Sequence, residues 1–280
     1  MKKIVSLSVI FLAVIILTLT IFLNKSSGNS NDRLDVIKKS GKIVMGCNAN
    51  YPPFEFHKNL DGKDEVMGFD IFIAEEIAKD LGVKLEISDM EFSSVLASLD
   101  TGIIDMALSG ISKTPEREKS ILFSKVYYDP KNYLLVNSKD LGKYKDENSV
   151  KDLTIGVQTA TTQEEIAKKL KIKNIVSLPK TPDLIVQLNQ ALIDGIIVEK
   201  CVGDNYELSN KNLKMENSFY FEADTDGTAI GLAKDDKELL EAVNKTLDRL
   251  EKEGKLEEYE FNNSLYYIFG GMTWRAKLKI

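Results

Sequence analysis

Leu108-Ser-Gly-Ile-Ser-Lys-Thr-Pro-Glu-Arg117 follows a short apolar run that begins at Ile103, and it leads into a cluster of charged residues. The apolar run is typical of a buried strand. Pro115 favours the start of a helix, and Thr114 supplies a side chain suited to the N-cap of that helix. The segment therefore predicts a strand, a turn and a helix start in succession.

The turn in this stretch carries small hydroxyl residues, and one arginine follows it. Ser112 can offer a hydroxyl and a backbone N–H group. Arg117, one helical turn in, can present its planar guanidinium bidentately to a carboxylate. The segment therefore predicts a carboxylate-binding site. The alternative is a surface arginine in a solvated helix start, paired with Glu116 or Glu118.

Length and charge limit the class of protein. The chain has 280 residues, 43% of them hydrophobic, and a net charge of -6. This length accommodates two domains of roughly 100 residues each, with a real core. Acidic and basic residues are interspersed and form no basic stripe, which argues against a nucleic-acid partner.

The N-terminus predicts export. Lys2 and Lys3 precede an uncharged apolar run from Ile4 to Leu23, and residues 24–31 are polar. A run of about twenty apolar residues suffices to span a bilayer, whereas a cleaved signal has a shorter core. We expect residues 1–31 to be an export signal or uncleaved membrane anchor with a linker. The body from residue 32 onward would then lie on the outer face of the cytoplasmic membrane.

Cys47 and Cys201 are the two cysteines of the chain. Neither directly follows the apolar N-terminal run, so no cysteine is available there for a lipid anchor. Two cysteines far apart in a body of this size do not make a disulfide framework, and we predict free thiols. A single bridge between them is the alternative.

The first half of the chain alternates between strand and helix patterns. Apolar residues recur at helical spacing between Asp70 and Leu81, and Gly82 ends that pattern. Such β-α-β-α-β alternation predicts a parallel sheet with helices outside. Ligands on such sheets bind beyond the carboxyl ends of strands, where Tyr51 and the turn from Ser109 to Ser112 are expected.

A second alternation follows Tyr133. The predicted strand Leu153 to Val157 leads through a loop to a helix, and Thr161 and Thr162 at its start have N-cap chemistry. Free N–H groups at a helix start are suited to an anion. A later predicted strand ends at Glu199.

Two α/β lobes joined by two crossings fit this order best. We expect lobe 1 to comprise residues 32–130 and 228–262, lobe 2 to comprise residues 131–227, and residues 263–280 to form a tail of unknown role. The crossings near residues 128–131 and 226–228 are predicted hinges, because short paired connections absorb backbone rotation while the lobes stay rigid.

The polar residues at the predicted strand ends suit a zwitterion. Its carboxylate would contact Arg117, Ser112 and the N–H of Thr162. Its ammonium group would contact Glu199 and a carbonyl near Ser109 or Gly110.

These motifs together resemble the extracytoplasmic amino-acid-binding proteins of ABC importers, the polar amino acid (family 3) solute-binding proteins. The resemblance covers roughly residues 33 to 260 and rests on motifs in a fixed order: Asn50-Tyr-Pro-Pro-Phe-Glu-Phe56, Gly68-Phe-Asp70, Gly110-Ile-Ser-Lys-Thr-Pro-Glu-Arg117, Phe123-Ser124, Tyr127-Tyr128, Gly156-Val157, Thr161-Thr162 and Leu239-Leu-Glu-Ala-Val-Asn-Lys245. It implies a two-lobed type II periplasmic-binding fold, in which each lobe has a mostly parallel sheet flanked by helices. It also implies a monomer without a cofactor that closes on an L-amino acid and docks on a membrane permease.

The resemblance assigns Arg117, Ser112 and Thr162 to the ligand carboxylate, and Tyr51 and Phe92 to an aromatic pair around the ligand side chain. The family's usual aspartate at the ammonium site is Glu199 here. Members that bind cationic side chains often carry an acid at the position of Asn48. That difference predicts a polar neutral ligand, with Asn48 and Gln158 as secondary candidates for contacts.

Several alternatives remain at this stage. Tyr51 could pack on the neighbouring prolines, Phe92 could belong to the core, and Glu199 could form a surface ion pair near Lys200. The scaffold could also carry a dehydratase-like enzyme, with Glu199 as a general acid, or a sensory module. His57, the only histidine, lies in a charged turn, so we predict no catalytic residues and no metal site.

Overall fold

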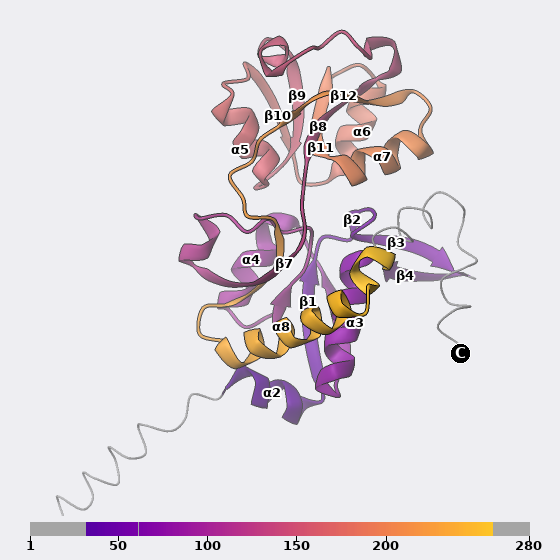
Figure 1. The fold of residues 1–280 in the computed structure, drawn as a ribbon. Helices are drawn as coiled ribbons and strands as arrows, with labels where there is room; N and C mark the ends of the chain where they lie inside the picture. The colour runs from indigo at the N-terminus through magenta and orange to yellow at the C-terminus, as the bar shows by residue number, and fades with distance from the viewer. Residues whose placement is uncertain (1–31, 61, 260–280) are drawn as a thin grey trace, which may run out of the picture.

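The computed structural model describes residues 32–60 and 62–259. Two five-stranded sheets, each flanked by helices, form two lobes that are joined by two crossing segments (Figure 1). This is the predicted α/β, two-lobed architecture.

The sheet of lobe 1 contains both parallel and antiparallel strands. Its strands are β1 (Lys42–Cys47), β5 (Lys84–Asp89), β6 (Met106–Ala107), β7 (Ile121–Tyr128) and β13 (Thr228–Ala233). The order is β5-β1-β6-β13-β7, with parallel pairs up to β6 and antiparallel pairs on both sides of β13. Only β13 therefore opposes its neighbours. The helices of this lobe are α2 (Arg33–Ser40), α3 (Phe69–Leu81), α4 (Phe92–Asp100) and α8 (Lys237–Lys252).

The sheet of lobe 2 repeats this arrangement. Its strands are β8 (Asn132–Asn137), β9 (Thr154–Gln158), β10 (Asn174–Leu178), β11 (Gly195–Glu199) and β12 (Leu213–Phe221). The order is β10-β9-β11-β8-β12, and β8 is the strand that runs opposite to its neighbours. The helices are α5 (Thr162–Lys169), α6 (Thr181–Asn189) and α7 (Lys200–Ser209), with short 3-10 turns at Ser138–Asp140 and Glu147–Val150.

A small antiparallel sheet extends lobe 1 beside the cleft. It consists of β2 (Asn50–Tyr51), β3 (Glu55–Leu60) and β4 (Lys63–Met67), in that order. The β3-β4 hairpin leads directly into α3. Gly82 ends α3 in the left-handed conformation, with φ 71° and its N–H donated to the carbonyl of Ala78.

Two connections cross between the sheets. Residues 129–131 join β7 to β8, and residues 222–227 join β12 to β13. The second crossing is attached to the turn after β6, because the N–H of Lys113 donates to the carbonyl of Gly227 at 2.7 Å and Ser112 forms a bridge with Thr228. The lobe boundaries and the hinges stay predictions. The division of the strands between the two five-stranded sheets supports them.

Local structure differs from the sequence prediction in four places. His57, predicted in a charged turn, lies on β3. The helix expected after Pro115 is a single 3-10 turn, Arg117–Lys119, because β7 begins at Ile121 and leaves no room for a longer helix. The strand expected from Ile103 to Leu108 is shortened to β6. Helix α7 and strand β12 were not predicted, since residues 200–223 mix apolar and polar residues without a clear period.

Three predictions concern residues outside the described ranges: the signal or anchor in residues 1–31, the end of lobe 1 beyond residue 259, and the tail 263–280. No helix within residues 32–60 and 62–259 is long and apolar enough to cross a membrane.

Candidate functional site

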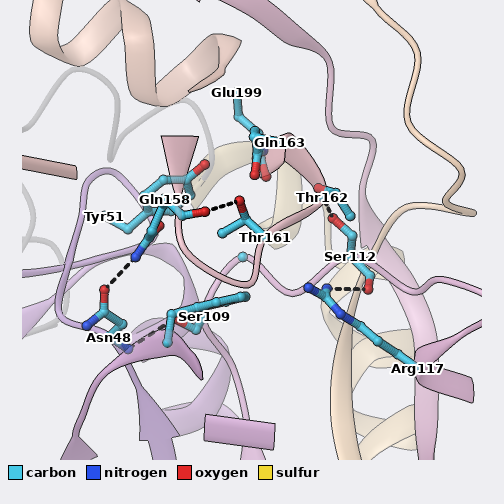
Figure 2. Close-up of a pocket in the computed structure, with 12 residues that line it drawn as sticks. Asn48, Tyr51, Ser109, Ser112, Arg117, Gln158, Thr161, Thr162, Gln163 and Glu199 are labelled. Carbon is cyan, nitrogen blue, oxygen red and sulfur yellow. Dashed lines mark hydrogen bonds between the residues drawn. The ribbon is translucent and has the colours of Figure 1, made fainter. Parts of the chain in front are cut away.

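One cavity between the lobes is lined by all of the residues predicted for the site. The space among them, which includes open solvent, amounts to about 300 Å³. Figure 2 shows the labelled side chains converging from both lobes. The predicted residues that line the cavity are Asn48, Tyr51, Phe92, Ser109, Gly110, Ser112, Arg117, Gln158, Thr161, Thr162 and Glu199.

Tyr51 forms an aromatic wall of the cavity. It is 8% exposed, and its ring stacks on Phe54 with centroids 5.8 Å apart. Gly110 lies against this ring in the left-handed conformation, at φ +56°, and a Cβ atom there would lie 3.2 Å from the Tyr51 ring. A glycine is therefore required where the strand end passes the aromatic wall.

Arg117 projects from its 3-10 turn to the cavity. Its guanidinium donates to the carbonyls of Ser112 at 2.9 Å and Ala160 at 3.1 Å, and it lies 5.7 Å from the Phe92 ring centroid. No carboxylate of the described residues lies within 4.0 Å of it. Burial lowers the pKa of Arg117, which still remains a cation at neutral pH.

The surface alternative for Arg117 is wrong, since both acidic neighbours have lysine partners. Glu116 pairs with Lys119, and Glu118 pairs with Lys113 at 3.3 Å. Phe92 was predicted either to contact the ligand or to belong to the core. In the structure it lines the cavity and also belongs to a core cluster of lobe 1.

The start of α5 faces Arg117 from lobe 2. The hydroxyl of Thr161 donates to the carbonyl of Gln158 at 2.7 Å and accepts from the N–H of Glu164 at 3.3 Å, so it is the N-cap. The hydroxyl of Thr162 lies 3.4 Å from that of Ser112. The first N–H groups of a helix have no partner within it, and those of α5 begin beside the Ala160 carbonyl that Arg117 contacts.

Glu199 ends β11 as a buried acid. Its side chain is 2% exposed, and its Oε2 has no hydrogen-bond partner among the described residues. Burial, reinforced by the charge of Asp70, raises the pKa of Glu199 to about 8. The surface-pair alternative is wrong, because Lys200 pairs with Asp204 at 2.6 Å.

Gln163 also lines the cavity, and sequence reasoning used it only as part of a helix. Its side-chain amide donates to Oδ1 of Asn132 at 2.7 Å and hydrogen-bonds Glu199. Gln163 therefore connects the acid to the strand that follows the first crossing. The only available sequence signal was its place directly after the two threonines.

Asn48 and Gln158 connect the lobes. The amide nitrogen of Asn48 donates to the carbonyl of Met90 at 2.8 Å, which turns its Oδ1 toward the cavity. That oxygen accepts from Nε2 of Gln158 at 2.9 Å. The two lobes are therefore in contact in this structure. The atom of Asn48 that faces lobe 2 is its acceptor oxygen.

Cys47 and Cys201 do not form a disulfide with each other, and Cys47 is buried. The hydroxyl of Tyr128 donates to Sγ of Cys201 at 3.3 Å. Within the described ranges, no group of three or more His, Cys, Asp or Glu side chains is arranged to hold a metal ion.

Comparison with known proteins agrees with this geometry. The arginine-binding extracellular protein ArtP of Bacillus subtilis (strain 168) is 35% identical over 237 residues, which cover 82% of this chain and 88% of that protein. The amino acid ABC transporter substrate-binding protein AbpA from Streptococcus pneumoniae Canada MDR_19A, solved bound to L-arginine, is 40% identical. It superposes with a TM-score of 0.81 over 84% of this chain and 99% of its own.

An ancestral amino acid-binding protein, AncCDT-1, described as a precursor of cyclohexadienyl dehydratase, is 29% identical, with a TM-score of 0.74 over 82% of this chain and 98% of its own. The profile of the bacterial extracellular solute-binding proteins, family 3, matches residues 43–261. With this match over most of its length, the chain belongs to the family 3 bacterial extracellular solute-binding proteins.

Proposed function

We propose that this protein binds an L-amino acid, with arginine as the favoured ligand, between its lobes and delivers it to an ABC-type importer. One observation carries the proposal: a cation and an acid without ionic partners, Arg117 and Glu199, line the same cavity. A zwitterion supplies both missing charges at once. Relatives named for arginine binding and for amino acid ABC transport support it.

The carboxylate of the ligand would accept from Arg117, the hydroxyl of Ser112 and the N–H of Thr162. The ammonium group would donate to the unpartnered Oε2 of Glu199. These contacts involve only the groups that all amino acids share, so they set the class of ligand and not its side chain.

The choice of arginine rests on Asn48 and the aromatic walls. A neutral amide at this position predicted a neutral ligand. Because Met90 holds the amide nitrogen, the cavity receives the Asn48 oxygen, which can accept from a guanidinium N–H. A planar guanidinium also stacks well on an aromatic ring such as that of Tyr51.

Calorimetry with the twenty amino acids, on protein freed of copurified ligand, is expected to give L-arginine as the tightest ligand. Citrulline, which has the same shape without the side-chain charge, is the matched control and should bind at least about 10-fold more weakly. Binding by none of the twenty would contradict the amino-acid proposal, and a preference for citrulline would contradict the choice of arginine.

We propose a binding role without catalysis. Glu199 is the only carboxyl that lines the cavity within the described residues, and acid–base chemistry on a carboxylate substrate needs a second positioned group. The relatives named above as binding proteins support this role. A dehydratase-like activity would appear as turnover of a bound carboxylate ligand that is lost in Glu199→Gln.

We further propose that the protein works as a monomer on the outer face of the cytoplasmic membrane, held there by its N-terminal segment. Membership of an extracellular family supports the location. The partner is then the permease of the importer, rather than the intracellular domain of a sensor.

We expect the ligand-free protein to open about residues 128–131 and 226–228. Several of the contacts that close the cleft are polar, such as those from Gln158 to Asn48 and from Arg117 to Ala160, and water can replace them. Small-angle scattering should show a smaller radius of gyration after L-arginine is added. An unchanged radius at saturating ligand would rule out hinge closure.

A further inference from the structure

Two carboxyl groups lie behind the cavity wall, where the proposed binding chemistry does not use them. Glu55 on β3 and Asp70 at the start of α3 are both 0% exposed. Burial raises the pKa of each, that of Glu55 well above its usual value and that of Asp70 to about 6. The two side chains are neighbours, because the N–H of Asp70 donates to the carbonyl of Phe54 at 3.0 Å and the two carboxyl groups accept from the adjacent residues Ser109 and Gly110.

Asp70 acts only as an acceptor. Its Oδ1 accepts from the hydroxyl of Tyr127 at 2.7 Å, and its Oδ2 accepts from the N–H of Gly110 at 2.8 Å. These two bonds favour the ionised form, so Asp70 is a carboxylate at neutral pH although burial raises its pKa to about 6.

Glu55 has a different set of partners. Its Oε1 accepts from the hydroxyl of Ser109 at 2.7 Å, while its Oε2 finds no donor among the described residues. Two ionised carboxylates cannot hydrogen-bond each other, and a buried acceptor without a donor is costly. A single proton on Oε2 removes both problems, because it donates to Asp70.

Among the described residues, the leading charge contributions to the pKa of Glu55 include no cation that could replace this proton. The charges that act on the carboxyl of Glu55 come from acids, Asp70 on α3 and Glu199 on β11. Glu55 in turn raises the pKa of three neighbouring groups, which are Cys47 on β1, Tyr51 on β2 and Tyr127 on β7. All of them are neutral or negative, so none of them stabilises a second negative charge.

We propose that Glu55 is a protonated positioning residue, which donates through Oε2 to Asp70 and orients the Ser109 hydroxyl so that only a lone pair faces the cavity. The pair also fixes the strand end, because Asp70 holds Gly110. The functional part of this inference rests on the proposed amino-acid binding.

The orientation of Ser109 follows from its bonds. Its one hydroxyl proton goes to Glu55, and one of its lone pairs accepts from the N–H of Asn48 at 3.0 Å. The remaining lone pair can serve only a ligand group that donates. Together with the Asn48 oxygen, it makes this part of the wall selective for a side chain rich in N–H groups.

Three variants test the assignment. Glu55→Gln keeps both bonds, since its oxygen can accept from Ser109 and its NH2 group can donate to Asp70, and should bind L-arginine within about 3-fold of wild type. Glu55→Leu removes both bonds. Asp70→Asn replaces one of the two acceptor oxygens of Asp70 with an NH2 group. The proton of Glu55 then has no acceptor, because the remaining oxygen is needed by Tyr127 or Gly110. Both should weaken binding by at least about 10-fold, which is the scale of one unpaired buried group.

A melting series across pH provides a readout that needs no ligand. The unfolded chain ionises Glu55 near its ordinary pKa and the folded chain does not. Stability of the wild type relative to Glu55→Gln therefore falls as pH rises above about 4.5, by roughly tenfold in the folding constant for each pH unit.

Glu216 is the matched control. It is 4% exposed and accepts from the N–H of Gly142 at 2.7 Å and that of Ser218 at 3.2 Å. Although burial raises its pKa, these bonds lower it on balance. A lowered folded pKa stabilises the protein above the unfolded pKa, so Glu216→Gln should be less stable than wild type at pH 7, with the opposite sign to Glu55→Gln.

The assignment fails if Glu55→Gln is as destabilised as Glu55→Leu, or if its stability relative to wild type does not change with pH. Infrared spectra offer a second check, because wild type should show a protonated carboxyl band that is absent from Glu55→Gln. These results do not depend on binding. A protein that passes both tests and binds no amino acid would contradict only the proposed function.

Discussion

Arg117→Ala is expected to lose L-arginine binding by roughly 30- to 5,000-fold. Truncation of one partner in a hydrogen-bonded charge pair costs about 2–5 kcal/mol, because the other charge is left without its partner in a desolvated site. In this cavity the ligand carboxylate would have only neutral donors left. Arg117→Lys keeps the charge but lacks the planar pair of donors, so it should fall between wild type and alanine.

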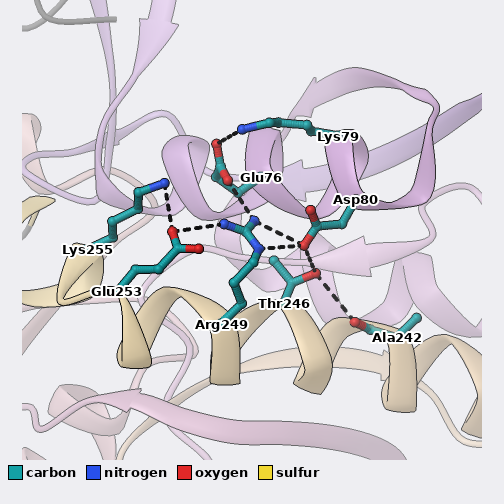
Figure 3. Close-up of polar contacts among 8 residues, drawn as sticks. All are labelled: Glu76, Lys79, Asp80, Ala242, Thr246, Arg249, Glu253 and Lys255. Carbon is teal, nitrogen blue, oxygen red and sulfur yellow. Dashed lines mark hydrogen bonds and ion pairs between the residues drawn. The ribbon is translucent and has the colours of Figure 1, made fainter.

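Arg249 provides the control for this experiment. It lies on α8, where it pairs with Glu76 and Asp80 of α3 at 2.6 and 3.0 Å (Figure 3). Arg249→Ala removes the same charge outside the cavity, so it should lower the melting temperature and leave the affinity unchanged. Calorimetry of the three variants at equal protein concentration decides the question. Equal affinity in Arg117→Ala and wild type would remove the basis of the proposed carboxylate site.

Glu199→Gln is expected to remove the pH dependence of binding. With the lobes in contact and no ligand between them, the pKa of Glu199 is raised to about 8, so binding of an ammonium group to this closed form at lower pH must release a proton. Wild-type affinity should therefore rise roughly tenfold per pH unit from about pH 6 and level off near pH 8. The variant should bind more weakly than wild type at pH 8, and the two should converge near pH 6.

Stability should change in the opposite direction. Because the folded pKa of Glu199 lies above its unfolded value, ionisation destabilises the wild type progressively as pH rises from about 4.5 to about 8. Glu199→Gln should thus melt above wild type at pH 8, although it binds ligand less well. Calorimetry in two buffers of different ionisation enthalpy measures the released proton directly. Identical pH profiles for the two proteins would show that Glu199 does not bind the ammonium group.

Short-range patterns and the family resemblance together named the candidate site residues. The turn after Leu108, the paired threonines and the acid at the end of a strand each have a local signature, and strand ends in an α/β lobe meet at one edge. For this reason every residue predicted for the site lines the same cavity. The elements that were missed, α7 and β12, have no such signature, and their structure depends on contacts with the rest of lobe 2.

The sequence by itself determined the α/β alternation, the two lobes and the residue types that face the cleft, because periodicity and capping act over a few neighbouring residues. Only the tertiary structure decided which atoms those residues present. The Asn48 oxygen faces the cavity because of Met90, the Ser109 hydroxyl turns toward Glu55, and Oε2 of Glu199 has no hydrogen-bond partner among the described residues. Hydrogen-bond direction and desolvation depend on partners that lie 42 to 54 residues away along the chain, which no local pattern records.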